Sequence, residues 1–156
     1  MVNTKSNVRG LYFEEFTPGM QVITAGRTVT ETDIVQFAGL SGDYNQIHTD
    51  EVYSQNSPFG KRVAHGLLGL SISSGLAVQT GILEGTVLLF REISEWKFIK
   101  PIYIGDTIHV IMNVVETKAL RRAGGGAVDI ELTVDNQEDE TVMKGTWRVL
   151  IASKPE

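Results

Sequence analysis

The sequence predicts an α+β domain, and three observations lead to this prediction. Helical patterns occupy the first half of the chain, and strand-like segments follow one another after Gly81. Two of these, 107–114 and 128–134, alternate apolar and polar residues, as antiparallel strands with one buried face do. The segment 65–79 has helical length, is small or apolar on all sides, and therefore belongs in the interior. Helices segregated from a later set of antiparallel strands define the α+β class.

The elements of the first half follow from turn residues, caps and apolar spacing. Thr30 is a good N-cap, because Asp33 stands three residues further on in a weak capping box. Apolar residues at helical spacing continue to Leu40, and Gly42 follows the end of this helix. The expected order is a loose tail at 1–10, a turn at Pro18-Gly19, a strand at 21–29 and a helix from 30 to 40.

A long connection, 41–64, leads to the second helix and holds only a turn or two of expected helix around 50–55. A connection of this length in a compact domain is usually functional, or else its elements are wrongly assigned. The helix 65–79 is a poor helix former in isolation, since each interior glycine costs about 1 kcal/mol relative to alanine. We expect it to be packed tightly in the core. The expected strands are 87–90, 92–99, 107–116, 127–134 and 141–151.

Composition narrows the class of protein. The length of 156 residues and the hydrophobic content of 42% fit one globular domain, expected over 11–156. Cysteine is absent, which excludes thiolate chemistry and fits a cytoplasmic location. The net charge of −5 argues against a nucleic-acid partner, and no apolar run is long enough to span a membrane. The N-terminus has no apolar leader segment, so we expect no secretory signal.

The most informative stretch is 37–48, which brings together an acid, an amide and an imidazole as Asp43, Asn45 and His48. A carboxylate and an imidazole are the usual groups for moving a proton at neutral pH. A second histidine, His65, stands where the next helix is expected to begin. The first backbone N–H groups of a helix are free to bind a developing oxyanion. The sequence therefore contains the parts of an acid/base site.

Each of these residues has a structural alternative. Asp43 and Asn45 suit an ordinary turn, in which such side chains bond to the local backbone. His48 could be a satisfied core histidine, and His65 could serve only to fix the start of its helix. Two histidines and a carboxylate can also bind zinc, although their spacing matches no compact zinc motif and we expect no metal.

The whole motif resembles the signature of the R-specific enoyl-CoA hydratases, the MaoC-like dehydratase domain. The resemblance rests on Phe37, Leu40-Ser41-Gly42-Asp43, Asn45, Ile47-His48 and the following Ser54. It extends over the chain after residue 10 through Tyr12–Phe16, Pro18-Gly19, Phe59-Gly60, Ala64-His65-Gly66, Trp96–Pro101 and Gly105-Asp106-Thr107. One departure is Gln46, where the family usually has a proline that stiffens the loop.

The resemblance implies a hot-dog fold, in which an antiparallel sheet wraps around one long helix. It implies that Asp43 and His48 are the catalytic pair and that the Gly66 N–H polarises the substrate carbonyl. Ser74 stands where such hydratases often have a serine near the site, although a small residue in a tight helix explains it equally well. Asn45 is expected to position the loop rather than to react.

The implied activity is reversible hydration of a trans-2-enoyl-CoA to an (R)-3-hydroxyacyl-CoA. Coenzyme A would enter as part of the substrate, and no resident cofactor is implied. The protein is expected to be a homodimer or a dimer of dimers. Two alternatives remain, a hot-dog thioesterase and a non-catalytic acyl-CoA-binding or regulatory protein, and the presence of both Asp43 and His48 favours the hydratase.

Overall fold

The computed structural model describes residues 10–155. Its strands form one antiparallel sheet in the order β1-β4-β5-β6-β3, with β2 also paired to β4. The helices are η1 (Phe13–Glu15), α1 (Glu31–Ser41), α2 (Gln46–Thr49), α3 (Glu51–Gln55), α4 (Gly66–Gln79) and η2 (Arg121–Ala123). The strands are β1 (Gln21–Ile23), β2 (Arg27–Thr28), β3 (Val87–Phe98), β4 (Thr107–Leu120), β5 (Gly125–Asp135) and β6 (Thr141–Ala152).

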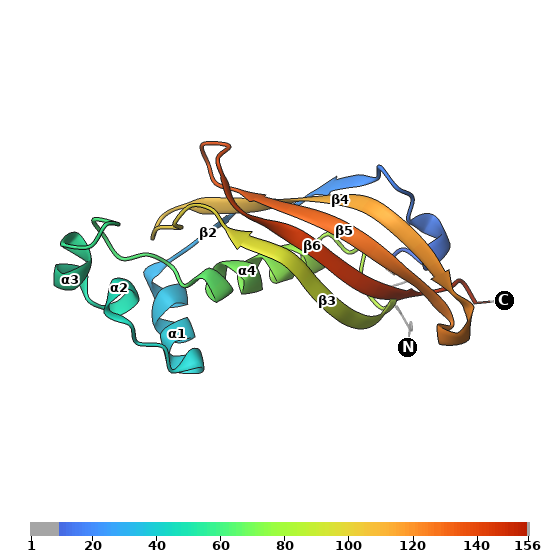
Figure 1. Cartoon of the computed structure of the whole chain (residues 1–156), viewed down its shortest axis with the longest axis horizontal. Coiled ribbons are helices and arrows are strands. Elements are labelled where there is room, and N and C mark those ends of the chain that lie inside the picture. Colours follow the sequence, from blue (N-terminus) through green and yellow to red (C-terminus); the bar gives the residue numbers. More distant parts are fainter. Residues whose placement is uncertain (1–9, 156) are drawn as a thin grey trace, which may run out of the picture.

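Helix α4 runs along one face of the curved sheet, as Figure 1 shows. Its buried apolar residues Leu68, Ile72 and Leu76 recur at helical spacing and join the core. The sheet contributes the larger part of that core, mainly from alternate positions of the three central strands. Burial of one such aliphatic side chain stabilises the fold by about 1.5–3 kcal/mol. The arrangement confirms the expected α+β class with a sheet wrapped around a central helix.

Two predicted helix starts, each marked by an N-cap residue, are confirmed. Thr30 is the N-cap of α1, its hydroxyl accepts the Asp33 N–H, and the Asp33 carboxylate accepts the Thr30 N–H. His65 is the N-cap of α4, which ends at Gln79 as predicted. None of the helices within residues 10–155 has the length and apolar character needed to cross a bilayer.

Several predictions of strands and loops were wrong in detail. The expected strands 87–90 and 92–99 form the single strand β3, which continues past Arg91 through a register shift between Phe90 and Glu92. The expected strand 21–29 is instead divided into β1 and β2. Helix α2 was not predicted, because a helix of four residues has no measurable apolar period. The expected tail 1–10 lies outside the described residues except for Gly10, which is buried.

Helices α1, α2 and α3 gather at the end of the molecule where α4 begins, while the described ends of the chain lie at the opposite end (Figure 1). The connection 42–65, which contains α2 and α3, therefore lies at the end of the molecule where α4 begins. Val63 pairs with Tyr103 in an isolated bridge, and the Ala64 N–H donates to the Ile102 carbonyl. These bonds tie the end of the connection to the turn before β4.

Candidate active site

The position of Asp43 is determined by the way α1 ends. Gly42 closes the helix with φ 76° and ψ 3°, a left-handed conformation that a residue with a Cβ adopts at a cost. The Asp43 N–H then donates to Ser41 Oγ, and the Asn45 N–H donates to Asp43 Oδ1 over 2.9 Å. One carboxylate oxygen therefore fixes the turn, and the other, Oδ2, remains available to groups outside it.

His48 is buried on the short helix α2, whose N-cap is Asn45. Its Nδ1 lies 2.7 Å from the carbonyl oxygen of Val63. Because a carbonyl only accepts hydrogen bonds, this Nδ1 carries a proton. In the neutral ring, Nε2 then has a free lone pair, and His48 can accept a proton from a bound molecule.

His65 makes two polar contacts through its two ring nitrogens. The Leu67 N–H lies 3.0 Å from Nδ1, and Nε2 lies 3.1 Å from Asp43 Oδ2. A backbone N–H only donates, so His65 Nδ1 must present its lone pair. Its proton is then on Nε2, where it is donated to the Asp43 carboxylate. The His48 and His65 rings lie 5.2 Å apart between centroids.

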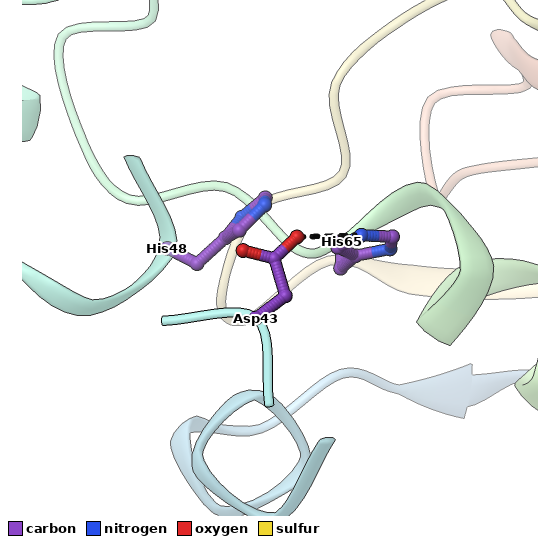
Figure 2. Close-up of side chains that lie close together, drawn as sticks. All are labelled: Asp43, His48 and His65. Atoms are coloured by element: carbon purple, nitrogen blue, oxygen red, sulfur yellow. Dashed lines mark ion pairs between the residues drawn. The ribbon is translucent and has the colours of Figure 1, made fainter. Parts of the chain in front are cut away.

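The three side chains form one cluster, with the Asp43 carboxylate between the two imidazoles (Figure 2). One polar atom from each lies within 4.8 Å of the other two, a spacing that a metal ion could occupy. The hydrogen bond from the Leu67 N–H makes metal binding unfavourable. It occupies the Nδ1 lone pair of His65 and leaves the ring proton on Nε2, the nitrogen that would have to bind the metal. The chemistry of the donor set thus suits proton transfer better than metal binding.

The surroundings of Asp43 favour its charged form. The Asn45 N–H first, and then the two neighbouring histidines, hold the pKa of this carboxyl below its usual range. The side chain of Asp43 is 42% exposed, so water reaches it. Asp43 is therefore ionised at neutral pH and accepts hydrogen bonds.

A cavity of about 480 Å³ opens beside the two histidines. Its walls are mostly apolar, and they include Ile47, Phe59, Val63, Ala64, Leu67, Phe98, Ile99, Ile102 and Met143. Gly66 also lines it, at the first turn of α4. A Cβ on Gly66 would lie 2.6 Å from Cε1 of Phe98, so only glycine lets this ring cover the start of the helix. The Gly66 N–H has no hydrogen-bond partner among residues 10–155, as expected at a helix N-terminus.

The structure brings four of the residues singled out from the sequence to one place, namely Asp43, His48, His65 and Gly66. Asn45 lies beside them and caps α2 through Ile47. Ser74 is exposed two turns further along α4 and does not line the cavity, so its assignment to the site stays a prediction. The same holds for the catalytic roles of the other residues, which follow from the family resemblance.

Sequence reasoning missed two groups that shape the site. The Val63 carbonyl sets the tautomer of His48, and Phe98 covers Gly66 from β3. A backbone carbonyl leaves no signal in a sequence. The position of Phe98 depends on where β3 lies across the sheet, which local patterns do not reveal.

Arg62 holds the connection against α1. Its guanidinium binds both carboxylate oxygens of Glu31, at 2.7 and 2.6 Å, and its Nε lies 2.9 Å from Glu51. Glu31 begins α1 and Glu51 begins α3, so this arginine joins two helices next to the site. Because Arg62 directly precedes Val63, the same contacts fix the carbonyl that His48 binds.

A curved antiparallel sheet around one helix, with an acid and two imidazoles at the start of that helix, defines a hot-dog domain with a candidate acid/base site. The model of the MaoC like domain family matches residues 13–136, and the chain belongs to this family.

Named relatives agree with the assignment of the chain to this family. The chain is 31% identical to the 3-hydroxybutyryl-CoA dehydratase of Methylorubrum extorquens over 149 residues, which is 96% of this chain and 89% of that protein. It is 39% identical over 103 residues to the (R)-specific enoyl-CoA hydratase of Rhodospirillum rubrum, covering 66% of this chain and 69% of the relative. The match to Protein MaoC of Klebsiella aerogenes is 43% identical over 99 residues, or 64% of this chain, but spans only 29% of that longer protein.

Solved structures confirm the fold. A protein from Archaeoglobus described as a monoamine oxidase regulatory protein superposes with a TM-score of 0.87 and 36% identity, over 94% of this chain and 97% of the other. A Mycobacterium tuberculosis protein described as a double hotdog fold gives a TM-score of 0.81 at 17% identity, and the match covers 94% of this chain and 46% of that one. The family therefore includes hydratases and dehydratases, and the fold is the hot-dog fold.

Proposed function

We propose that this protein adds water reversibly to a trans-2-enoyl thioester and forms an (R)-3-hydroxyacyl thioester. The observation that carries the proposal is the pairing of a free His48 Nε2 with the ionised Asp43 carboxylate beside an apolar cavity. The relatives described as an enoyl-CoA hydratase and a 3-hydroxybutyryl-CoA dehydratase support this class of substrate.

In the proposed reaction, Asp43 and His48 hold one water between them. Its oxygen bonds to the β-carbon while one of the two groups takes a proton from it. The α-carbon receives one proton, so that H and OH add across the double bond. When His48 is neutral, neither the Asp43 carboxylate nor His48 Nε2 carries a proton. The proton that is removed from water is therefore also the one that is delivered to the α-carbon. Each such transfer group contributes about 10²–10⁴-fold to the rate.

The free N–H of Gly66 is the proposed donor to the thioester oxygen. Negative charge develops on that oxygen when the β-carbon is attacked, and the first turn of α4 offers a fixed dipole for it. The apolar walls of the cavity would hold the acyl chain next to this donor. A single oxyanion donor is typically worth about 10²–10³-fold in turnover.

The direct test is to incubate the protein with crotonyl-CoA and to follow loss of the enoyl absorbance, with free thiol assayed in parallel. Loss of absorbance without thiol supports hydration. Release of thiol without loss of the enoyl group would instead identify a thioesterase. Binding without either change would favour a non-catalytic or regulatory role, the alternative to which the description of the Archaeoglobus structure points.

We also propose that the protein is at least a homodimer. Strand β3 ends the sheet order, and it exposes the large apolar side chains Val87, Leu88, Leu89, Phe90, Ile93 and Phe98. Helix α4, which has no charged residue, exposes Leu67 and Val78. An apolar edge strand is a ready surface for pairing with a second copy. The solved structure described as a double hotdog fold, of which this chain matches 46%, is consistent with such pairing.

Light scattering tests this at micromolar concentration, where we expect a mass of at least twice 17.1 kDa. Leu89→Glu should dissociate the dimer, because it buries a charge at the proposed contact. Val115→Glu, at a similarly exposed apolar residue on β4, is the matched control and should leave the mass unchanged. A stable wild-type monomer would contradict the proposal.

A further inference from the structure

His65 lies between the start of α4 and the Asp43 carboxylate and bonds to both. The Leu67 N–H requires a lone pair on Nδ1, and this leaves the ring proton on Nε2, facing Asp43 Oδ2. We propose that His65 is a positioning residue that works in this one tautomer and ties the Asp43 carboxylate to the helix turn that carries the Gly66 N–H. This inference deepens the proposed hydratase function and rests on it.

Histidine is an unusual N-cap, and the other caps show what it adds. Thr30, Asn45 and Asp50 cap α1, α2 and α3 through a side-chain oxygen that accepts one backbone N–H. Such short side chains complete the cap. The imidazole of His65 also caps its helix, but its second nitrogen extends beyond the helix to Asp43, a contact that the cap does not need.

Two aromatic side chains lie against the His65 ring. Phe37 of α1 lies 5.2 Å from it between centroids, and His48 of α2 lies at the same distance. Figure 2 shows the Asp43 carboxylate between the two imidazoles. A ring confined by its neighbours and bonded at both nitrogens keeps one orientation, and the carboxylate oxygen that it binds is held with it.

The two histidines thereby take opposite tautomers. His48 donates from Nδ1 to the Val63 carbonyl and presents a lone pair on Nε2. His65 accepts at Nδ1 and donates from Nε2 to Asp43. His48 is therefore equipped to exchange a proton with a bound molecule. His65 instead supports the acid through a hydrogen bond, and a proton on its Nδ1 would break the helix cap.

The contact also bears on the charge of Asp43. The titratable groups in contact with this carboxyl among residues 10–155 are His65, at the start of α4, and His48, on α2. The Asn45 N–H and then these two histidines lower the pKa of Asp43. Loss of the His65 donor should therefore raise the pKa of Asp43, while the bond from Asn45 remains.

Two substitutions separate the two contacts of His65. His65→Asn places an amide oxygen near the position of Nδ1 and keeps the cap, but it has no atom at the position of Nε2. His65→Gln places an amide nitrogen near Nε2 and loses the cap. Crotonyl-CoA hydration, the carbon-13 titration of Asp43 and the melting temperature are measured for both variants and for His109→Asn on β4, the control.

We expect His65→Asn to melt near the wild-type temperature. Its kcat should fall about 10- to 100-fold, because the Asp43 carboxylate is no longer held in place. The pKa of the Asp43 carboxyl, followed by carbon-13 NMR, should rise in this variant. His65→Gln should melt lower yet keep more of the turnover at a temperature where it is folded. His109→Asn should match the wild type. A fully active His65→Asn with an unchanged Asp43 pKa would overturn the proposal.

Nitrogen-15 NMR of the imidazoles gives a readout that does not depend on activity. We expect the proton on Nε2 of His65 and on Nδ1 of His48, and the same tautomer in both rings would contradict the inference. If the wild type hydrates no enoyl thioester, the proposed function fails on that result alone. The tautomers, together with carbon-13 titration of Asp43 in His65→Asn, still decide whether His65 holds this carboxylate.

Discussion

The connection 42–65 and the three central strands of the sheet are held in place by different forces. In the connection, polar side chains bond to nearby backbone, as Ser54 Oγ does to the carbonyls of Gln46 and Ile47. In the sheet, apolar side chains such as Ile130 and Leu132 are almost completely removed from water. The difference suggests a division of tasks, in which the sheet supplies stability that the connection uses to present reactive groups.

If this division is correct, changes in the connection should reduce activity and leave the stability of the fold unchanged. Changes in the sheet should reduce stability and leave activity unchanged. The largest effect is expected at the proposed catalytic pair. Asp43→Asn keeps an oxygen for the Asn45 N–H, and His48→Asn keeps a donor near the Val63 carbonyl. Each should lower the turnover of crotonyl-CoA by about 10²–10⁴-fold, because the two groups together hold the water and move its proton.

The double variant should be little worse than either single variant, since residues that act as a unit are not additive. Circular dichroism and thermal melting serve as controls for folding. Turnover close to the wild-type rate in either folded single variant would remove that residue from the proposed pair.

The sheet should respond in the opposite sense. Leu132→Ala on β5 leaves a cavity in the core, and we expect it to lower the free energy of unfolding by about 2–5 kcal/mol. Chemical denaturation measures this loss. The folded variant should keep a kcat near the wild-type value at low temperature. A large loss of kcat in the fully folded variant would show that the two regions are coupled.

Arg62 tests how the connection is attached. Arg62→Gln removes the contacts to Glu31 and Glu51, and we expect about a 10-fold fall in kcat/KM from misplacement of the Val63–His48 contact. Hydrogen exchange over 46–64 should speed up. The matched control is Arg148→Gln, which breaks an arginine–carboxylate pair with Asp129 on the sheet and should leave kcat/KM unchanged.

The same ion pairs predict a dependence on pH. Arg62 lowers the pKa of Glu31 from its usual 4.5. A carboxyl with a lowered pKa adds stability above its unfolded value, and this stability is lost as the pH falls through the lowered pKa. Amide protection over 46–64, measured relative to the intrinsic exchange rate at each pH, should therefore fall below about pH 4.5 in the wild type but change less in Arg62→Gln. Equal acid sensitivity in both would exclude this role of the ion pairs.

The smallest expected effect concerns Gln46. It is the first residue of α2, where proline is well tolerated, and its predecessor Asn45 has the extended ψ of 136° that proline requires. Gln46→Pro should therefore stabilise the protein by about 0.4–1 kcal/mol through the unfolded chain. Activity on crotonyl-CoA should persist, and kcat/KM for short and long enoyl chains shows whether this loop shapes the acyl pocket. Destabilisation would mean that the loop needs the Gln46 N–H.

Local chemistry in the sequence was enough to determine several parts of this protein. The Thr30 cap, the end of the helix at Gly42 and the apolar helix 65–79 all depend on neighbours within a few residues. The alternating strands likewise predicted the sheet. The closeness of Asp43 and His48 follows from their spacing of five residues, so the core of the candidate site was predictable from the sequence.

Only the tertiary structure decided how these groups are oriented. The tautomer of His48 depends on the Val63 carbonyl, the contact of Asp43 with His65 crosses from α1 to α4, and Phe98 reaches Gly66 from β3. Each contact joins residues that are many positions apart, and no local propensity encodes such a pairing. A sequence therefore reveals which proton-transfer groups are present, but the direction of each proton is set by backbone groups that packing alone brings within hydrogen-bond distance.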